Sequence, residues 1–156
     1  TASASEIFSA AIQDYHRGLV IGEPTFGKGT VQNLVDLDRF AQGDSEKPEL
    51  GELKMTIQEF FRINGGSTQL KGVTPDIEFP KNGDDKDFGE STYDNALKWT
   101  QIAPANYQVV ANLNAYLPQL QKLHAERTAK SPAWKLMLDE LAQYRAMRAK
   151  TSTSLN

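Results

Sequence analysis

The chain contains no cysteine and only two histidines, His16 and His124, which stand far apart in the sequence. The absence of cysteine excludes a disulfide framework, a thiolate metal site and a cysteine nucleophile. Two distant histidines are too few for a histidine-rich zinc site, and a Ser-His-Asp triad would have to use one of them. Neither a thiolate site nor a histidine-rich site for a metal ion is therefore expected.

Long apolar runs are absent as well, since no stretch approaches the roughly 18 residues that a membrane-spanning helix needs. The formal net charge of −3 is too small to suggest a nucleic-acid partner. Residues 1–6 have no initiator methionine, charged n-region or apolar h-region, so they are not a signal peptide. We expect the chain to be a piece of a longer protein.

What is present is a mixed pattern of helix and strand in the first half. Residues 4–16 predict an amphipathic helix that begins with a capping box, in which Ser3 is the N-cap and Glu6 its partner, and that ends at Gly18. The short apolar run at 19–22 predicts a strand buried on both faces. Further strands are expected at residues 30–37, 53–63 and 67–70, with a hairpin turn at 64–66 and an extended segment at 72–79.

The second half predicts helices alone. A short helix is expected at 93–99, followed by two longer helices whose apolar stripes predict packing faces: Leu113, Tyr116, Leu117, Leu120 and Leu123 on one, and Trp134, Met137, Leu138, Leu141 and Tyr144 on the other. The predicted fold class is therefore α+β (mixed α/β). Residues 1–80 form a partial sheet with a helix and a β-hairpin, residues 81–90 form an acidic linker, and residues 91–156 form an all-α appendage.

The loop from Gly22 to Lys28 matches the G-x-x-x-x-G-K core of a phosphate-binding loop. Four features argue against that function. Gly29 replaces the Ser or Thr that holds magnesium, Glu23 would put a carboxylate beside the phosphate, and Pro24 lacks an N–H. The segment that follows also predicts a strand, whereas the motif needs a helix N-terminus.

Lys28 lies between two glycines, a setting that favours close approach to another part of the chain. A solvated loop lysine is the simpler interpretation, just as Ser3 is most simply a helix cap. A Ser–Lys dyad requires a neutral lysine, and neutralising an ordinary lysine at pH 7 costs about 4.6 kcal/mol. Burial lowers a lysine pKa by roughly 3–5 units, which covers that cost. The residues alone leave both interpretations open.

Three segments carry a resemblance to a known family: TASASEIF at 1–8, GEPTFGKGTVQ at 22–32 and GVTPDI at 72–77. They closely resemble the tail-specific (carboxy-terminal processing) serine proteases. The spacing from Ser3 to Lys28 also equals the spacing between the serine and the lysine of that family. The helical remainder resembles the C-terminal extension of the bacterial periplasmic branch.

The resemblance implies a role for each residue that matches the motifs. Ser3 is the nucleophile, Lys28 is the general base, and Gln32 orients the lysine by accepting a hydrogen bond. The backbone N–H of Ala4 is one donor of the oxyanion hole, and the second donor in this family comes from a glycine upstream of the serine. Ser5 is the competing serine and is expected to be structural, and neither histidine need be catalytic.

The resemblance also implies a serine endopeptidase that cleaves proteins with nonpolar C-terminal tails through an acyl-enzyme, without a cofactor, in the periplasm of a Gram-negative bacterium. The family's PDZ domain and the first half of its protease core are not in this chain. We therefore expect the isolated fragment to fold, to be inactive, and to self-associate through a bared apolar sheet edge. The alternative is a non-catalytic interaction module, whose helical extension docks an adaptor protein or the protease body.

Overall fold

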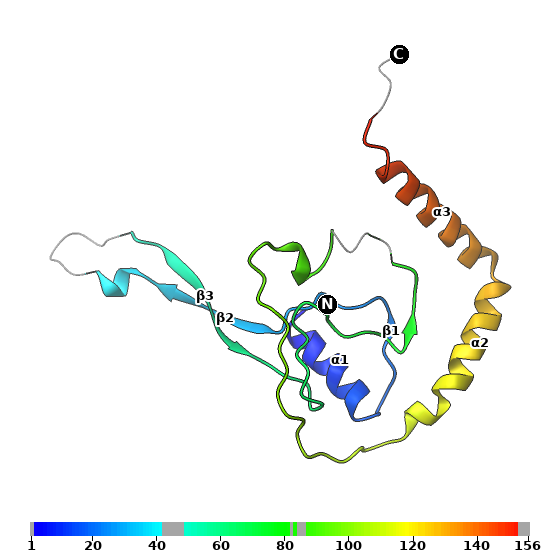
Figure 1. Ribbon diagram of the computed structural model, residues 1–156, viewed down its shortest axis with the longest axis horizontal. Coiled ribbons are helices and arrows are strands. Elements are labelled where there is room, and N and C mark those ends of the chain that lie inside the picture. Colours follow the sequence, from blue (N-terminus) through cyan, green and yellow to red (C-terminus); the bar gives the residue numbers. More distant parts are fainter. Residues whose placement is uncertain (1, 42–48, 82, 84–86, 153–156) are drawn as a thin grey trace.

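The computed structural model describes residues 2–41, 49–81, 83 and 87–152. Helix α1 (Ala4–Asp14) lies at the centre, and the hairpin of β2 (Thr30–Asp36) and β3 (Glu52–Glu59) projects to one side of it (Figure 1). Helices α2 (Leu117–Ala129) and α3 (Pro132–Arg148) lie on the opposite side. The predicted α+β class, a partial core with a helical C-terminal part, is confirmed.

Helix α1 buries Glu6, Ala10 and Asp14, which recur every fourth residue and so share one face. Two of these three side chains are carboxylates, so hydrogen bonds as well as apolar contact hold this face in place. The helix ends at Asp14 rather than near Gly18 as expected. The reason is His16, whose φ of 54° turns the backbone away from the helix two residues before the glycine.

Strands β1 (Ile21–Gly22) and β4 (Ile77–Glu78) pair in parallel, with Ile21 opposite Ile77. The Asp76 carboxylate reinforces this pairing by accepting a 2.8 Å hydrogen bond from the Val20 N–H. The expectation that the first strand is buried on both faces is wrong, because Ile21 is 57% exposed. Among the described residues, β4 is the only strand beside β1, which leaves the other edge uncovered.

Strands β2 (Thr30–Asp36) and β3 (Glu52–Glu59) form an antiparallel hairpin with a bulge between Val31 and Gln32. The 3₁₀ turn η1 (Asp38–Phe40) follows β2. Strand β3 ends earlier than the predicted limit of residue 63, but a bridge between Phe61 and Ser67 closes the expected turn.

The strand expected at 67–70 is not formed. Beyond Ser67 the backbone turns, with a φ of 63° at Leu70 and a 2.8 Å hydrogen bond from the Gly72 N–H to the Thr68 carbonyl. The turn packs this segment against the loop that contains Lys28, and it therefore replaces the strand.

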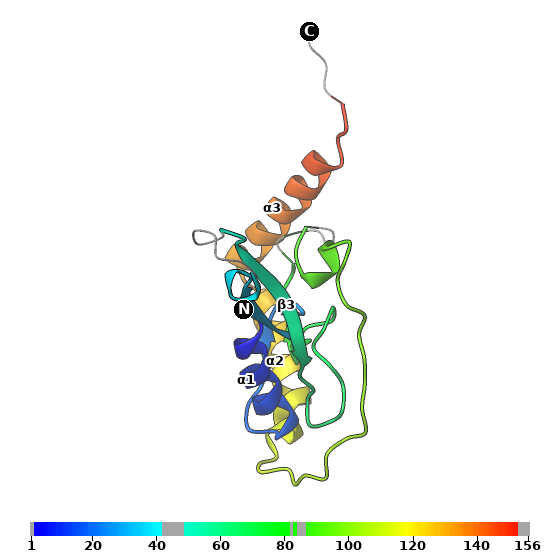
Figure 2. The same ribbon diagram turned by 90° about the vertical axis from the view of Figure 1, so that its left-hand side faces the viewer.

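The helix expected at 93–99 is also wrong. A single 3₁₀ turn, η2 (Glu90–Thr92), precedes an irregular segment that continues past Trp99. Bonds to the core hold it: the Trp99 indole N–H donates to the Ser67 carbonyl at 2.7 Å, and the Ser67 N–H donates to the Thr100 carbonyl at 3.2 Å. The chain then runs along the outside of the molecule to η3 (Leu113–Tyr116) and α2 (Figure 2).

Helices α2 and α3 confirm the two longer helices predicted. Ring contacts among Phe79, His124 and Trp134 join them to the end of β4. The expected packing faces are only partly formed, since in the described part of the chain neither helix buries a residue fully. Arg148 of α3 pairs with Asp87, whose carboxylate raises the pKa of the guanidinium above its ordinary value.

Residues 82 and 84–86 of the predicted linker lie outside the described residues. None of the helices in the described ranges combines the length and the apolar character that crossing a membrane requires.

Candidate active site

Ser3 stands directly before α1 in a backbone conformation that residues with a side chain rarely adopt, with φ 55° and ψ −114°. Such a conformation costs about 1–3 kcal/mol and is often found at functional sites. The helix N-terminus beside it favours a developing negative charge. Ala4 is the first helical residue, so its N–H has no acceptor within the helix.

The structure brings Lys28 and Gln32 together. The Lys28 amine donates to Gln32 Oε1 at 3.1 Å and to Thr30 Oγ1 at 3.2 Å. Gln32 is fixed in turn across the hairpin, because its Nε2 donates to Thr56 Oγ1 of β3 at 3.4 Å. The hairpin thus presents two oxygen acceptors to the lysine.

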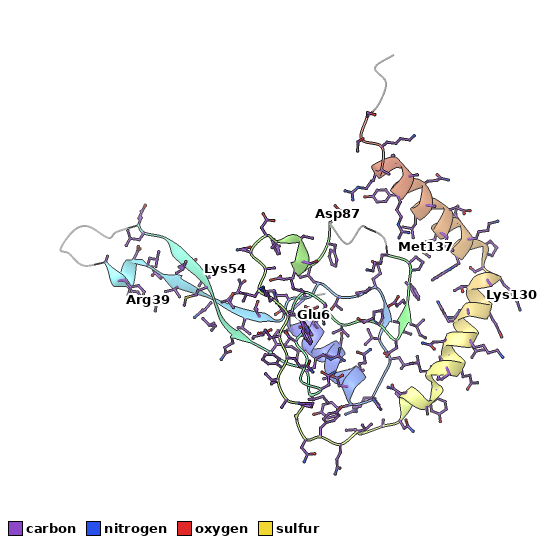
Figure 3. The ribbon with its side chains drawn as sticks, viewed as in Figure 1. Glu6, Arg39, Lys54, Asp87, Lys130 and Met137 are labelled. Carbon is purple, nitrogen blue, oxygen red and sulfur yellow. The ribbon has the colours of Figure 1, made fainter. Side chains whose placement is uncertain are left out.

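Glu6 connects the turn at Ser3, which we call the serine turn, to the loop that contains Lys28, which we call the lysine loop. Its side chain is fully buried (Figure 3), and one carboxylate oxygen, Oε2, accepts from the N–H of Ser3 at 2.7 Å and from the N–H of Lys28 at 3.0 Å. The other oxygen, Oε1, accepts from the Gly27 N–H at 2.7 Å and from the Thr25 hydroxyl. The sequence indicated only the first of these bonds, as half of a capping box.

The glycines beside Lys28 allow the close approach that the sequence predicted. A Cβ atom at Gly29 would lie 2.6 Å from the backbone nitrogen of Gln69, closer than real Cβ atoms come. This close approach allows a hydrogen bond, which the Gly29 N–H donates to Gln69 Oε1 at 2.9 Å. Gly27 has a φ of 90°, and its carbonyl accepts from the Leu70 N–H at 2.8 Å.

A second buried polar network holds the other end of α1. The Asp14 carboxylate pairs with the Arg62 guanidinium, whose Nε lies 2.9 Å from Asp14 Oδ2. The neighbouring Gln13 accepts from Arg62 at 2.8 Å and donates to Asp76 at 3.0 Å. Both ends of the helix that follows Ser3 are therefore fixed to the core. The sequence carried no local signal for this network, because its members lie far apart in the chain.

Ser3 and Ser5 lie outside the hydrogen-bonded group that Lys28, Thr30 and Gln32 form. Among the described residues, the Lys28 amine hydrogen-bonds with Thr30 and Gln32 and not with Ser3. The Ser5 hydroxyl donates to the Ala2 carbonyl at 2.9 Å, a bond that belongs to the start of the helix.

Neither histidine is part of the group. His16 follows the far end of α1, and His124 contacts Phe79 and Trp134. The residues after Lys28 form strand β2, so the helix that a phosphate-binding loop requires is not there.

A cleft of about 580 Å³ opens beside the Lys28 amine. It is lined by Phe26, Lys28, Thr30, Gln32, Lys54, Thr56, Glu90, Tyr93, Asn95, Ala96 and Leu97. Its volume is within the usual range of ligand sites, about 300–1,000 Å³. In the described part of the chain, no cluster of three or more histidine and carboxylate side chains could hold a metal ion.

Comparison with known families matches the chain in two parts. The sequence model of peptidase family S41 matches residues 1–79. A second model, described as the C-terminal domain of tail specific protease, matches residues 83–156.

Similar proteins from bacteria include a tail-specific protease of Haemophilus influenzae, which is 48% identical over 160 aligned residues that cover 100% of this chain and 23% of that protein. A carboxy-terminal-processing protease of Bartonella bacilliformis is 36% identical over 107 residues, or 65% of the chain and 22% of that protein. A carboxyl-terminal-processing protease of Picosynechococcus is 57% identical over 81 residues, or 52% of the chain and 17% of that protein. The chain thus spans less than a quarter of the length of each of these relatives.

Proposed function

Because this chain belongs to peptidase family S41, we propose that it supplies the nucleophile and the general base of a serine endopeptidase, as the C-terminal part of a longer protein. The nucleophile is Ser3 and the base is Lys28. The observation that carries the proposal is the environment of the Lys28 amine, which has two oxygen acceptors at 3.1 and 3.2 Å.

A neutral lysine amine has two N–H bonds and one lone pair. If Gln32 and Thr30 accept the two N–H bonds, the lone pair remains free to take the proton from the Ser3 hydroxyl. The serine oxygen then attacks the carbonyl carbon of the peptide bond, and the lysine ammonium returns the proton to the leaving amine. A water molecule, deprotonated by the same lysine, attacks the acyl-enzyme, and the lysine ammonium returns the proton to the departing Ser3 oxygen, which restores the free serine and the neutral lysine.

The charge that develops on the carbonyl oxygen during attack needs hydrogen-bond donors. The Ala4 N–H supplies one of them at the N-terminus of α1, where the helix dipole also favours the negative oxygen. The Ser3 backbone has an uncommon conformation, and its N–H donates to Glu6. Because such conformations are often found at functional sites, this one supports the assignment of the adjacent Ala4 N–H. A second donor comes from upstream of this chain.

The substrates we propose are proteins with nonpolar C-terminal tails, cut at internal peptide bonds in the periplasm of a Gram-negative bacterium, and no cofactor takes part. The names of the Haemophilus and Bartonella relatives, tail-specific and carboxy-terminal-processing, support the choice of tail. The resemblance of the sequence motifs to the tail-specific proteases supports the periplasmic location and the nonpolar character of the C-terminal tails.

The test is cleavage by the full-length protein of two unfolded reporters that differ only in a nonpolar or a charged C-terminal tail. We expect the nonpolar reporter to be cut faster, and the Ser3→Ala and Lys28→Ala variants to cut neither. Ser5→Ala is the matched control and should retain most of the activity. Equal cleavage of the two reporters would refute the tail preference, and cleavage by Ser3→Ala would refute the nucleophile.

A second candidate function is a non-catalytic interaction module, favoured by the exposure of apolar side chains on α2 and α3, such as Leu123 and Leu136 at 48% and 59%. In this case residues 91–156 dock an adaptor or the protease body. A pull-down of purified protease body with residues 91–156 alone separates the two candidates. Binding without any effect of Ser3→Ala on the function of the whole protein would favour the module.

A further inference from the structure

Residues 88–99, which we call the strap, cross the core beside the loop that contains Lys28. At one end the Phe88 ring meets the Phe26 ring edge-on at 5.4 Å, and the Glu90 N–H donates to the Phe26 carbonyl at 2.8 Å. At the other end the Trp99 indole N–H donates to Ser67. The strap belongs to the part of the chain that matches the C-terminal domain of tail specific protease.

A buried side chain also joins the strap to the loop that contains Lys28. Gln69 is fully buried, and its Oε1 accepts from the Gly29 N–H at 2.9 Å. Its Nε2 donates to Glu90 Oε1 at 3.3 Å and to the Leu97 carbonyl at 3.1 Å. Together with the contacts of Phe88 and Glu90 to Phe26, this amide group fixes the position of the strap relative to Lys28.

The cleft beside Lys28 lies between two walls. The hairpin wall carries Lys28 and Gln32, together with the polar side chains of Lys54 and Thr56 from β3 (Figure 3 labels Lys54). The strap wall carries Tyr93 and Leu97, whose side chains are 56% and 51% exposed although both line the cleft. Phe26 and the strap residues Glu90, Asn95 and Ala96 complete the lining, so the large apolar side chains of the cleft lie on the strap side and at Phe26, next to polar strap residues.

We propose that the strap is the side-chain recognition wall of the substrate site, and that Tyr93 and Leu97 contact an apolar side chain next to the peptide bond that is cut. The proposal rests on the proposed protease function, because the peptide bond must reach the Lys28 amine in the other wall. Two exposed apolar side chains on a firmly anchored segment offer contact area to a ligand without a cost of ordering the wall. The polar hairpin wall is left to bind the peptide backbone.

Specificity for the substrate side chain would then depend on the strap, which lies outside the residues 1–79 that match the peptidase family. Its test uses the full-length protein and a series of peptides with Ala, Leu or Phe at the positions on either side of the cut bond. Leu97→Ala removes part of the contact with a large apolar side chain, so we expect the ratio of kcat/KM for the Phe peptide to that for the Ala peptide to fall about tenfold. Tyr93→Ala removes contact at a second position of the same wall and should lower the ratio as well.

Lys98→Ala is the matched control, because Lys98 is an exposed residue of the strap that does not line the cleft. Its ratio should equal that of the wild type. Each ratio is measured within one variant, so a partly unfolded fraction, which lowers all rates equally, leaves it unchanged.

The two proposals fail in different ways. If cleavage depends on Ser3 and Lys28 but both strap variants keep the wild-type ratio, the recognition wall is wrong and the protease function stands. If Lys28→Ala cuts as fast as the wild type, the protease mechanism is wrong and the recognition wall falls with it.

Discussion

Replacement of Glu6 by glutamine tests whether one carboxylate holds the serine turn and the lysine loop together. The carboxylate accepts from three backbone N–H groups and one hydroxyl, and the side chain is fully buried. A glutamine of the same size keeps one acceptor oxygen and puts an NH₂ group where the other was. With the NH₂ group toward Ser3 and Lys28, two N–H donors lose their acceptor; with the NH₂ group toward Gly27 and Thr25, the Gly27 N–H loses its acceptor, whereas the Thr25 hydroxyl can accept from the amide.

The magnitude follows from the orientation that loses least, in which one buried N–H is left without an acceptor. Such a donor costs about 1–3 kcal/mol, so Glu6→Gln should lower the free energy of unfolding by about that amount. The backbone of Ser3 or Lys28 should also move, and a displacement of about 1 Å in an active site can reduce the rate on the order of 100-fold. Glu52→Gln is the control, since Glu52 is exposed at the start of β3 and should change stability by less than about 0.5 kcal/mol.

Urea unfolding of the chain measures the stability change, and kcat/KM of the full-length protein measures the activity. Glu6→Asp keeps the charge but withdraws the oxygens, so it should be intermediate in both assays. The reasoning is refuted if Glu6→Gln matches Glu52→Gln in stability and cleaves at the wild-type rate.

Three further predictions concern the supports of the site and the fragment itself. Arg62→Ala leaves the buried Asp14 carboxylate without its partner, so thermal or urea unfolding should show a loss of about 3–5 kcal/mol, and a loss below 1 kcal/mol would contradict a structural role for the pair. Gly29→Ala puts a Cβ within 2.6 Å of the Gln69 nitrogen, so kcat/KM should fall at least tenfold, whereas Gly83→Ala, where a Cβ meets nothing within 4 Å, should have no effect. The isolated 156-residue chain should not cut a tailed reporter and should self-associate at high concentration through the open edge of β1, where Ile21 is exposed. Cleavage by this chain alone, or a strictly monomeric species in light scattering, would contradict the corresponding half of that prediction.

The parts of the fold that the sequence predicts are those that local chemistry determines. Helix α1 follows from its capping box and apolar spacing, and strands β2 and β3 follow from their β-branched and apolar residues, although the hairpin was expected at the turn 64–66 and not between these two strands. The segments at 67–70 and 93–99 could not be predicted, because contacts between them decide both conformations. Trp99 donates across 32 residues to Ser67, and such a contact leaves no trace in either local pattern.

The same division applies to the site. Ser3, Lys28 and Gln32 are found from motifs, and the structure adds that Lys28 and Gln32 meet. The residues that support them were missed in part or in full. Glu6 was expected to bond only three residues back, whereas its bonds to Gly27 and Lys28 span 21 and 22 residues. The bonds of the fully buried Gln69 also link distant segments, so neither role has a signature within a short window.

The central claim is that Ser3 forms the acyl-enzyme and that Lys28 activates it. The most direct measurement is mass spectrometry of the full-length protein, quenched during turnover of a peptide ester and then digested. We expect an acyl adduct on the peptide that contains Ser3, present in the Ser5→Ala variant and absent from Ser3→Ala and Lys28→Ala. An adduct on Ser5, or an adduct on Ser3 that forms at the wild-type rate in Lys28→Ala, would contradict the account.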